Sequence, residues 1–228
     1  MAQPLTIPVA LSNRHVHLSR EHVEALFGKD HALCAQKPLS QPGQFACQET
    51  VELVGPKGAM PGVRVLGPER PSSQVELSIT DGFVLGLSVP VRVSGDIAGT
   101  PGGHLMGPKG AVRLSEGFIV AARHIHLEPG HAAQAGLVDG QKVAVRVLGR
   151  RGLVYEEVVV RVSDKFRTEL HLDIDEGNAG AVKNGDLVEV VTGVCELCPA
   201  QACDLRQDVS QGVARPFCDF ASSSLRIR

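Results

Sequence analysis

Short apolar segments that alternate with polar positions recur along most of the chain, separated by turns that contain glycine and proline. Alternation with a period of two places every second side chain on one face, as in a half-buried β-strand. The clearest segments lie at 51–54, 63–66, 75–79, 143–147, 158–162 and 187–191. Two Gly-Pro-Lys-Gly sequences, at 55–58 and 107–110, fit β-turns. Neither has the spacing of a phosphate-binding Walker loop, so we interpret both as hairpin turns.

Only short helical segments interrupt this pattern. Ser19 suits an N-cap and Gly28 a C′ position, which predicts a helix over 20–27. Pro129 suits the first position of a second short helix, which ends at Gly136. Many short strands in two similar halves predict a mainly β fold of two tandem small β-barrels, related by internal duplication and each capped by short α-helices. Such barrels have no interior cavity, so we expect functional groups on a surface or in the cleft between them.

One short motif occurs at matched positions of the two halves. Arg-His-Val-His-Leu spans 14–18 and Arg-His-Ile-His-Leu spans 123–127, which is an offset of 109 positions. In a strand, the two histidines of each copy lie on one face, about 7 Å apart. A single pair of this kind is more often exposed or part of a core, but two copies in matched surroundings indicate metal ligands. The histidines are His15 and His17 in the first copy, and His124 and His126 in the second.

A second repeated segment adds a third candidate ligand to each pair. Residues 70–82 and 165–177 both contain an alternating strand followed by an acidic residue and glycine, and their alignment places Glu76 opposite His171 at an offset of 95. Taken singly, these two side chains could be an ordinary strand carboxylate and a satisfied polar histidine. Three protein ligands per site leave open coordination positions, as catalytic metal sites do. The two predicted groups are His15, His17 and Glu76, and His124, His126 and His171.

Length and composition set the wider frame. The 228 residues, 43% of them hydrophobic, suffice for two small cores, and the duplication predicts repeats at 1–95 and 96–191 and an extension at 192–228. The net charge of −2 gives no general attraction for nucleic acid or an anionic membrane. The first ten residues lack signal-peptide features, and no apolar run reaches about 18 residues, so we expect a cytoplasmic protein.

The extension at 192–228 carries four of the six cysteines. They are Cys195, Cys198, Cys203 and Cys218. A Cys-X-X-Cys pair with a third cysteine nearby could bind zinc or an iron–sulfur cluster, but the fourth cysteine is distant. We favour a flexible appendage used for targeting or assembly.

Several of these motifs together resemble the PduL-type phosphotransacylases, the phosphate propanoyltransferase family. They lie at 12–18, 70–76, 93–96, 121–126 and 169–171. The resemblance, which covers about 7–191, implies two tandem β-barrels and two divalent metal ions, usually Zn²⁺, on the six ligands above. It implies a phosphate acyltransferase that interconverts acyl-CoA and phosphate with acyl phosphate and CoA, with propionyl-CoA or acetyl-CoA as substrate. It also implies propanediol degradation, bacterial microcompartment shell or core proteins as partners, and self-association.

The same resemblance suggests roles for further residues. Arg70 is the expected phosphate ligand, because its planar guanidinium matches phosphate oxygens in pairs, and Ser94 would add a hydrogen bond. We expect the metal of the first group to take the CoA sulfur and that of the second to polarise the thioester carbonyl. Coenzyme A contacts are carried over to Lys37, Arg64 and Asn178.

Two other functions fit the same ligands. A dinuclear metallohydrolase would cleave a thioester or ester with these six residues and would not need the phosphate-binding group of Arg70. A non-catalytic zinc-binding assembly protein belongs to another class, although every ligand position is filled and both sites look coordinatively open. The effect of phosphate on release of CoA distinguishes these functions.

Overall fold

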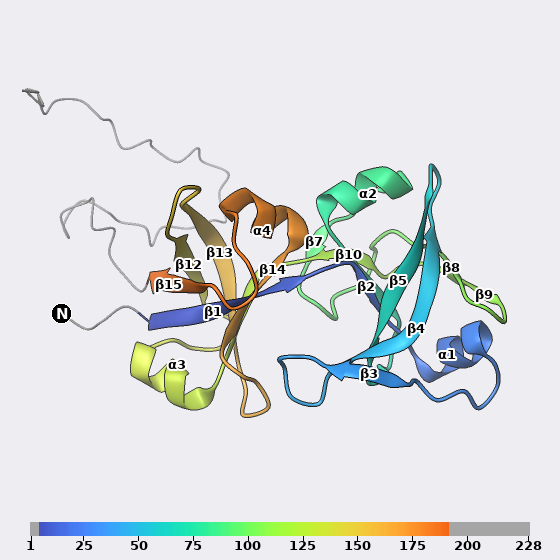
Figure 1. The fold of residues 1–228 in the computed structure, drawn as a ribbon, viewed down its shortest axis with the longest axis horizontal. Coiled ribbons are helices and arrows are strands. Elements are labelled where there is room, and N and C mark those ends of the chain that lie inside the picture. The colour runs from blue at the N-terminus through green and yellow to red at the C-terminus, as the bar shows by residue number, and fades with distance from the viewer. Residues whose placement is uncertain (1–4, 192–228) are drawn as a thin grey trace, which may run out of the picture. The chain divides into compact units, whose positions relative to one another are not determined.

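A closed β-barrel and an open β-sheet make up residues 5–191, the part of the chain that this computed structural model describes (Figure 1). Around the barrel the strand order is β1 (Leu5–Ser12), β14 (Glu169–Asp173), β11 (His124–Leu127), β13 (Leu153–Val162), β12 (Lys142–Val147) and β15 (Leu187–Val191). The mainly β prediction is confirmed, and one of the two predicted barrels is closed.

The open sheet has nine strands. Along its path the order is β7 (Val91–Arg92), β10 (Phe118–Ala121), β6 (Gln74–Leu77), β2 (His15–His17), β5 (Ala59–Gly67), β4 (Phe45–Val54), β8 (Gly103–Met106) and β9 (Ala111–Leu114), with β3 (Ala35–Pro38) paired to β4. Each sheet contains strands from both halves of the sequence. The predicted repeats at 1–95 and 96–191 therefore remain a prediction from the duplicated sequence motifs. The predicted extension at 192–228 lies outside the described residues.

The chain crosses between the two sheets just before each histidine motif. Strand β1 pairs in parallel with β14, which carries His171, and leads into β2, which carries His15. Strand β10 pairs in parallel with β6, which carries Glu76, and leads into β11, which carries His124. The two crossovers therefore bring both motifs to the junction of the sheets, although they lie far apart in the sequence (Figure 1).

Each sheet covers its own hydrophobic core. Leu53, Leu105 and Phe118 are fully buried in the core of the open sheet, and Ile125 and Leu170 in that of the barrel. Alternation along the strands produces both cores, since every second side chain faces inward. Burial of such side chains is the dominant favourable contribution to folding of each sheet.

Four short helices cover the sheets within the described residues. They are α1 (Arg20–Phe27), α2 (Ile79–Leu85), α3 (Pro129–Ala135) and α4 (Ile174–Gly180). The prediction of α1 is confirmed, with the Ser19 side chain capping its N-terminus and Gly28 at its end. In α3, Pro129 occupies the first turn and Gly136 adopts the left-handed conformation that ends the helix, also as predicted. None of these helices is long and apolar enough to cross a bilayer.

The two Gly-Pro-Lys-Gly sequences are hairpin turns, as predicted. Gly107 N donates to Gly110 O at 2.9 Å, and the turn packs against the end of α1, where Lys109 N donates to Leu26 O at 3.0 Å. The equivalent turn at 55–58 packs in the same way against the end of α2. The first glycine of each turn is required because it touches helix backbone.

Replacing Gly107 by alanine is expected to lower the free energy of unfolding by about 1–3 kcal/mol. A Cβ atom there would lie 2.5 Å from Leu26 O, closer than real Cβ contacts allow. In Gly130→Ala the added methyl would meet nothing within 4 Å, so this control is expected to be neutral or slightly stabilising. Urea unfolding of both variants checks the prediction, and equal stabilities would contradict it.

Candidate active site

The first predicted ligand group forms on two adjacent antiparallel strands of the open sheet. His15 and His17 lie on β2, and Glu76 lies directly opposite His15 on β6. His15 Nε2 lies 3.4 Å from Glu76 Oε2, and His17 Nε2 lies 3.8 Å from Glu76 Oε1. One potential ligand atom of each residue lies within 4.8 Å of the others, and all three residues are buried.

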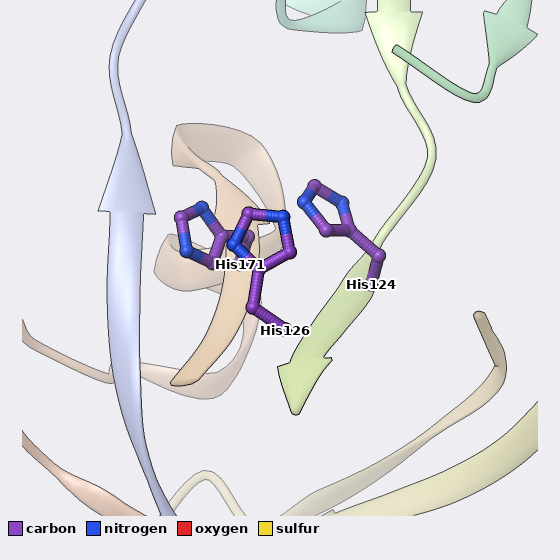
Figure 2. A group of neighbouring side chains, drawn as sticks. All are labelled: His124, His126 and His171. Atoms are coloured by element: carbon purple, nitrogen blue, oxygen red, sulfur yellow. The ribbon is translucent and has the colours of Figure 1, made fainter. Parts of the chain in front are cut away.

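The second group forms in the same way in the barrel. His124 and His126 lie on β11, and His171 lies opposite His124 on the antiparallel strand β14. Figure 2 shows the three imidazoles gathered together, with ring centroids 4.6–5.0 Å apart. Phe166 stacks on the His126 ring at 4.0 Å and closes one side of the group. The alignment of the two sequence halves thus assigned Glu76 and His171 each to the histidine pair beside which it lies. The role of these residues as metal ligands stays a prediction.

Backbone carbonyls orient one imidazole of each group. His15 Nδ1 lies 2.8 Å from Asn13 O, and His124 Nδ1 lies 2.8 Å from Ala122 O. A carbonyl can only accept, so we assign the proton of each ring to Nδ1, which leaves the lone pair of Nε2 free. Metal-binding histidines commonly have this outer contact.

The charges of the two groups suit a divalent cation. Burial, followed by repulsion from neighbouring imidazoles, lowers the pKa of His17 to about 3, of His124 to about 4 and of His126 to about 2. Burial opposes ionisation of Glu76, but His15, His17 and other neighbours outweigh it and hold its pKa at about 2. These three imidazoles are therefore neutral and the carboxylate ionised, as metal ligation requires.

Unsatisfied buried nitrogens also fit a metal. His17 Nδ1 and His126 Nδ1 are buried without a hydrogen-bond partner. Such atoms are rare in native proteins, since an unpaired buried polar atom costs free energy. Two sets of three imidazole or carboxylate donors with open positions suit Zn²⁺ or a similar ion.

Both groups line one cavity of about 440 Å³. Arg70, Arg161 and Lys37 add positive charge to its walls. Burial, and secondarily the nearby charge of Arg161, lowers the pKa of Arg70. Two arginines close enough to affect each other suit an anionic ligand. Of the two expected locations, a surface or the cleft between the β units, this cavity fits the second, while its function stays a prediction.

Ser94 connects Arg70 to the first group. Its hydroxyl accepts hydrogen bonds from Arg70 Nη1 at 3.3 Å and Gln74 Nε2 at 3.0 Å, and it donates to Glu76 Oε1 at 2.8 Å. Ser94 therefore holds both the arginine and the carboxylate in place. A direct contact of Ser94 with phosphate stays a prediction.

The duplication extends to residues around the groups. Arg14, just before His15, forms an ion pair with Asp81 at 2.7 Å, and Arg123, just before His124, pairs with Glu176 at 3.0 Å. Both acids belong to the capping boxes at the N-termini of α2 and α4. Each ligand strand is thus tied to the helix that follows the third ligand of its own group.

The expected coenzyme A residues are not all found together. Lys37 and Arg64 line the cavity, with Arg64 Nη1 donating to Cys47 O at 3.0 Å. Asn178 is exposed on α4 and is not among the lining residues, so its contact stays a prediction. Sequence reasoning missed Arg161, which lies opposite His126 on β13. Its Val-Arg-Val pattern gave no signal, because Arg92 and Arg146 share the pattern and do not line the cavity.

The chain matches known proteins over most of its length. A family model described as phosphate propanoyltransferase matches residues 8–183. A phosphate propanoyltransferase of Thermotoga maritima is 51% identical over 81% of this chain and 89% of its own length. Those of Listeria monocytogenes and Rhodopseudomonas palustris are 50% and 48% identical, over 78% and 82% of this chain and 84% and 83% of their own lengths. With its motifs, fold and cavity, this chain belongs to the phosphate propanoyltransferase family.

Proposed function

We propose that this protein is a metal-dependent phosphate acyltransferase, which interconverts a short-chain acyl-CoA and phosphate with acyl phosphate and CoA. The acyl group in this proposal is propionyl, with acetyl as the alternative. The observation that carries the proposal is one cavity lined by both ligand groups and by Arg70. Membership of the phosphate propanoyltransferase family supports the choice of substrates.

In the direction of acyl phosphate synthesis, a phosphate oxygen attacks the thioester carbonyl carbon. The new C–O bond forms, the C–S bond breaks, and CoA leaves as a thiolate. Two divalent ions, Zn²⁺ in our proposal, would stabilise the thiolate and polarise the carbonyl when bound to the two groups. The protein side chains would hold the reactants in line for this attack. Such positioning accounts for much of the rate enhancement in reactions of this kind.

Arg70 is the phosphate ligand in this proposal. Its guanidinium lies in the cavity wall and is steadied by Ser94, so it can pair two phosphate oxygens without losing further side-chain entropy. Arg161 adds a second charge from the barrel side, where it also lies 5.6 Å from the centre of the Phe166 ring. The two arginines together would neutralise much of the charge of the phosphate.

Coenzyme A carries several phosphate groups, which need positive charge outside the reaction centre. Lys37 is exposed at the cavity and Arg64 is half-buried beside it, so both can meet these groups, and we keep Asn178 as a third contact on resemblance alone. We extend the proposal to a cytoplasmic enzyme of propanediol degradation that self-associates and binds microcompartment shell or core proteins. Co-purification of the full chain with shell proteins tests this extension.

The test is release of CoA from propionyl-CoA, with and without inorganic phosphate, by protein supplied with Zn²⁺. We expect release only with phosphate, and acyl phosphate that can be trapped as a hydroxamate. Release that needs no phosphate would instead identify a metallohydrolase. No release from protein that holds two metal ions would favour a non-catalytic zinc-binding protein.

A further inference from the structure

Each ligand group has a fourth residue that the sequence alignment did not single out. On the facing strands β2 and β6, His17 lies opposite Gln74, and on β11 and β14, His126 lies opposite Glu169. Gln74 and Glu169 precede the third ligands, Glu76 and His171, by two positions and so share their face of the strand. Each group is therefore a square of four side chains, three of which are candidate ligands.

In the first group, the fourth residue is a neutral donor beside a carboxylate. Gln74 Oε1 accepts a hydrogen bond from Gly95 N at 2.7 Å, which fixes the direction of the amide. Its Nε2 must then point to Glu76, whose Oε1 accepts at 2.6 Å. Gln74 is buried, so this contact is shielded from water. The other oxygen of Glu76, Oε2, lies 3.4 Å from His15 Nε2.

In the second group, the fourth residue is a carboxylate beside an imidazole. Glu169 Oε2 lies 3.3 Å from His171 Nε2 and accepts a hydrogen bond from Gln41 Nε2 at 2.9 Å. The Gln41 amide is fixed in turn, because it donates to Arg167 O at 3.0 Å and accepts from Arg167 N at 3.2 Å. The same carboxylate oxygen, Oε2, thus contacts both the fixed Gln41 amide and the His171 ring.

We infer that Gln74 and Glu169 are positioning residues, each matched in charge to the ligand beside it. A carboxylate ligand is oriented by a donor, whereas an imidazole ligand is oriented by an acceptor for its second N–H. With the proton of His171 on Nε2, directed to Glu169, Nδ1 is the atom that faces the metal. This inference rests on the proposed function, because it takes both groups to hold metal ions.

The distance of 3.3 Å between His171 Nε2 and Glu169 Oε2 lacks the alignment of a hydrogen bond. A metal ion bound at His171 Nδ1 would fix the rotation of the imidazole ring. A small rotation of that ring suffices to align Nε2–H with the Glu169 carboxylate. A purely structural role for Glu169, as an anchor for Gln41, predicts no effect on metal binding. The two roles therefore differ in a measurable way.

The test is titration of metal-free full-length protein with Co²⁺, whose visible spectrum reports the ligands of each site. In Glu169→Gln we expect about 10- to 100-fold weaker binding at one of two sites, with a changed spectrum there. Glu169→Asp keeps the charge and is expected to retain more of the affinity. In Gln74→Ala the other site should weaken. His17→Ala and His126→Ala, which each remove one site, identify which site has changed.

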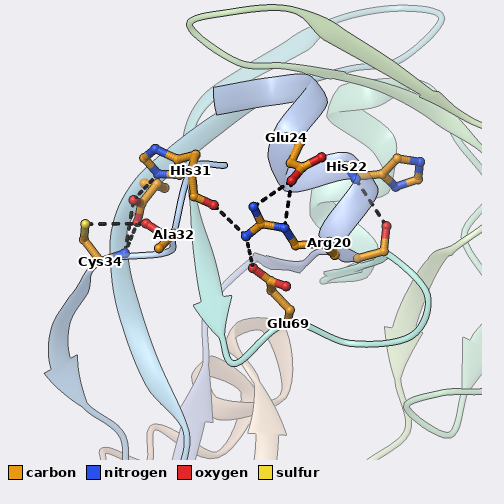
Figure 3. A network of polar contacts seen from close by, with 9 residues as sticks. Arg20, His22, Glu24, His31, Ala32, Cys34 and Glu69 are labelled. Carbon is orange, nitrogen blue, oxygen red and sulfur yellow. Dashed lines mark hydrogen bonds and ion pairs between the residues drawn. The ribbon is translucent and has the colours of Figure 1, made fainter. Parts of the chain in front are cut away.

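Glu49→Gln is the matched control. Glu49 is also a buried carboxylate paired with an imidazole, since its Oε1 lies 2.7 Å from His31 Nε2, and it accepts a hydrogen bond from Cys34 N at 3.1 Å. His31 belongs to the polar network around α1, where its carbonyl accepts a hydrogen bond from Arg20 (Figure 3). Neither His31 nor Glu49 is among the residues that line the cavity. Its substitution should leave both Co²⁺ affinities unchanged. Any Co²⁺ bound by cysteines would show intense thiolate-to-cobalt absorption. That absorption distinguishes cysteine-bound Co²⁺ from Co²⁺ in the two predicted sites.

The outcomes separate this inference from the function on which it rests. Two sites in the wild-type protein with unchanged affinities in Glu169→Gln would overturn the inference alone. Equal weakening of both sites in that variant would also overturn it, because it would show a general loss of structure. A wild-type protein that binds no Co²⁺ at either group would overturn the metal-dependent function itself.

Discussion

Replacing Arg70 by alanine is expected to lower phosphate-dependent release of CoA by about 100- to 1,000-fold. Arg70 lies in the cavity wall, and its Nη1 contacts the Ser94 hydroxyl, which also binds Glu76. Its loss would leave phosphate with one arginine, Arg161, and without a paired contact near the first ligand group. We expect a rise in the KM for phosphate together with a fall in kcat.

Two further variants define the role of Arg70. Arg70→Lys keeps the charge but not the planar pair of donors, so it should recover only part of the activity. Arg146→Ala is the control, because Arg146 lies on the barrel strand β12, pairs with Glu189 at 3.8 Å and is not part of the cavity. Steady-state kinetics with varied phosphate measure all three. An Arg70→Ala variant as active as Arg146→Ala would contradict the assignment of phosphate to Arg70.

The duplication made much of the fold and of the candidate site predictable. A strand has only two faces, so the His-X-His spacing already placed each pair of side chains together. Alignment of the second repeated segment then matched Glu76 with His171, and the structure places each beside its histidine pair. Turn and cap residues such as Ser19 and Gly28 act locally, which is why the short helix between them was also predictable.

Long-range pairing was not predictable from the same patterns. Nothing in the sequence of β1 shows that it closes the barrel between β14 and β15, because its alternation would fit either sheet. Arg161 occupies a polar position of an alternating strand, which usually faces water, but the crossover of the chain turns that face toward the cavity. Gln74 and Glu169 were not predicted, because each is an ordinary polar strand residue until strand pairing brings it opposite His17 or His126.

The third member of each ligand group, Glu76 in one and His171 in the other, differs in charge. The first group contains the ionised carboxylate of Glu76, whereas the second contains three histidines and no carboxylate. A cation in the second group would keep more of its charge and act as the stronger electrophile, which suits polarisation of a carbonyl. A cation in the first group is better suited to hold a thiolate. If both groups hold metal ions, the change of one ligand would give the two sites different tasks.

Removing the metal ions is expected to lower the phosphate-dependent activity on the order of 1,000-fold or more, because metal ions supply several kcal/mol of transition-state stabilisation. His126→Ala and His17→Ala should each show a comparable loss, since each removes a ligand from one of the two groups. Dialysis against a chelator, followed by assay before and after addition of Zn²⁺, tests the metals. Metal analysis of the two variants, with one ion expected in place of two, tests the ligands.

His104→Ala is the matched control for these histidine variants. His104 is exposed on β8, where it lies opposite Arg113, and it belongs to neither ligand group. Its substitution should leave both the metal content and the activity unchanged.

The metal should also stabilise the folded chain, because an ion that binds only the native state raises its free energy of unfolding. Chelation should therefore lower the melting temperature of the wild-type protein and lower it less in His126→Ala. Full activity after complete removal of metal would contradict a metal-dependent reaction, whatever the melting temperatures.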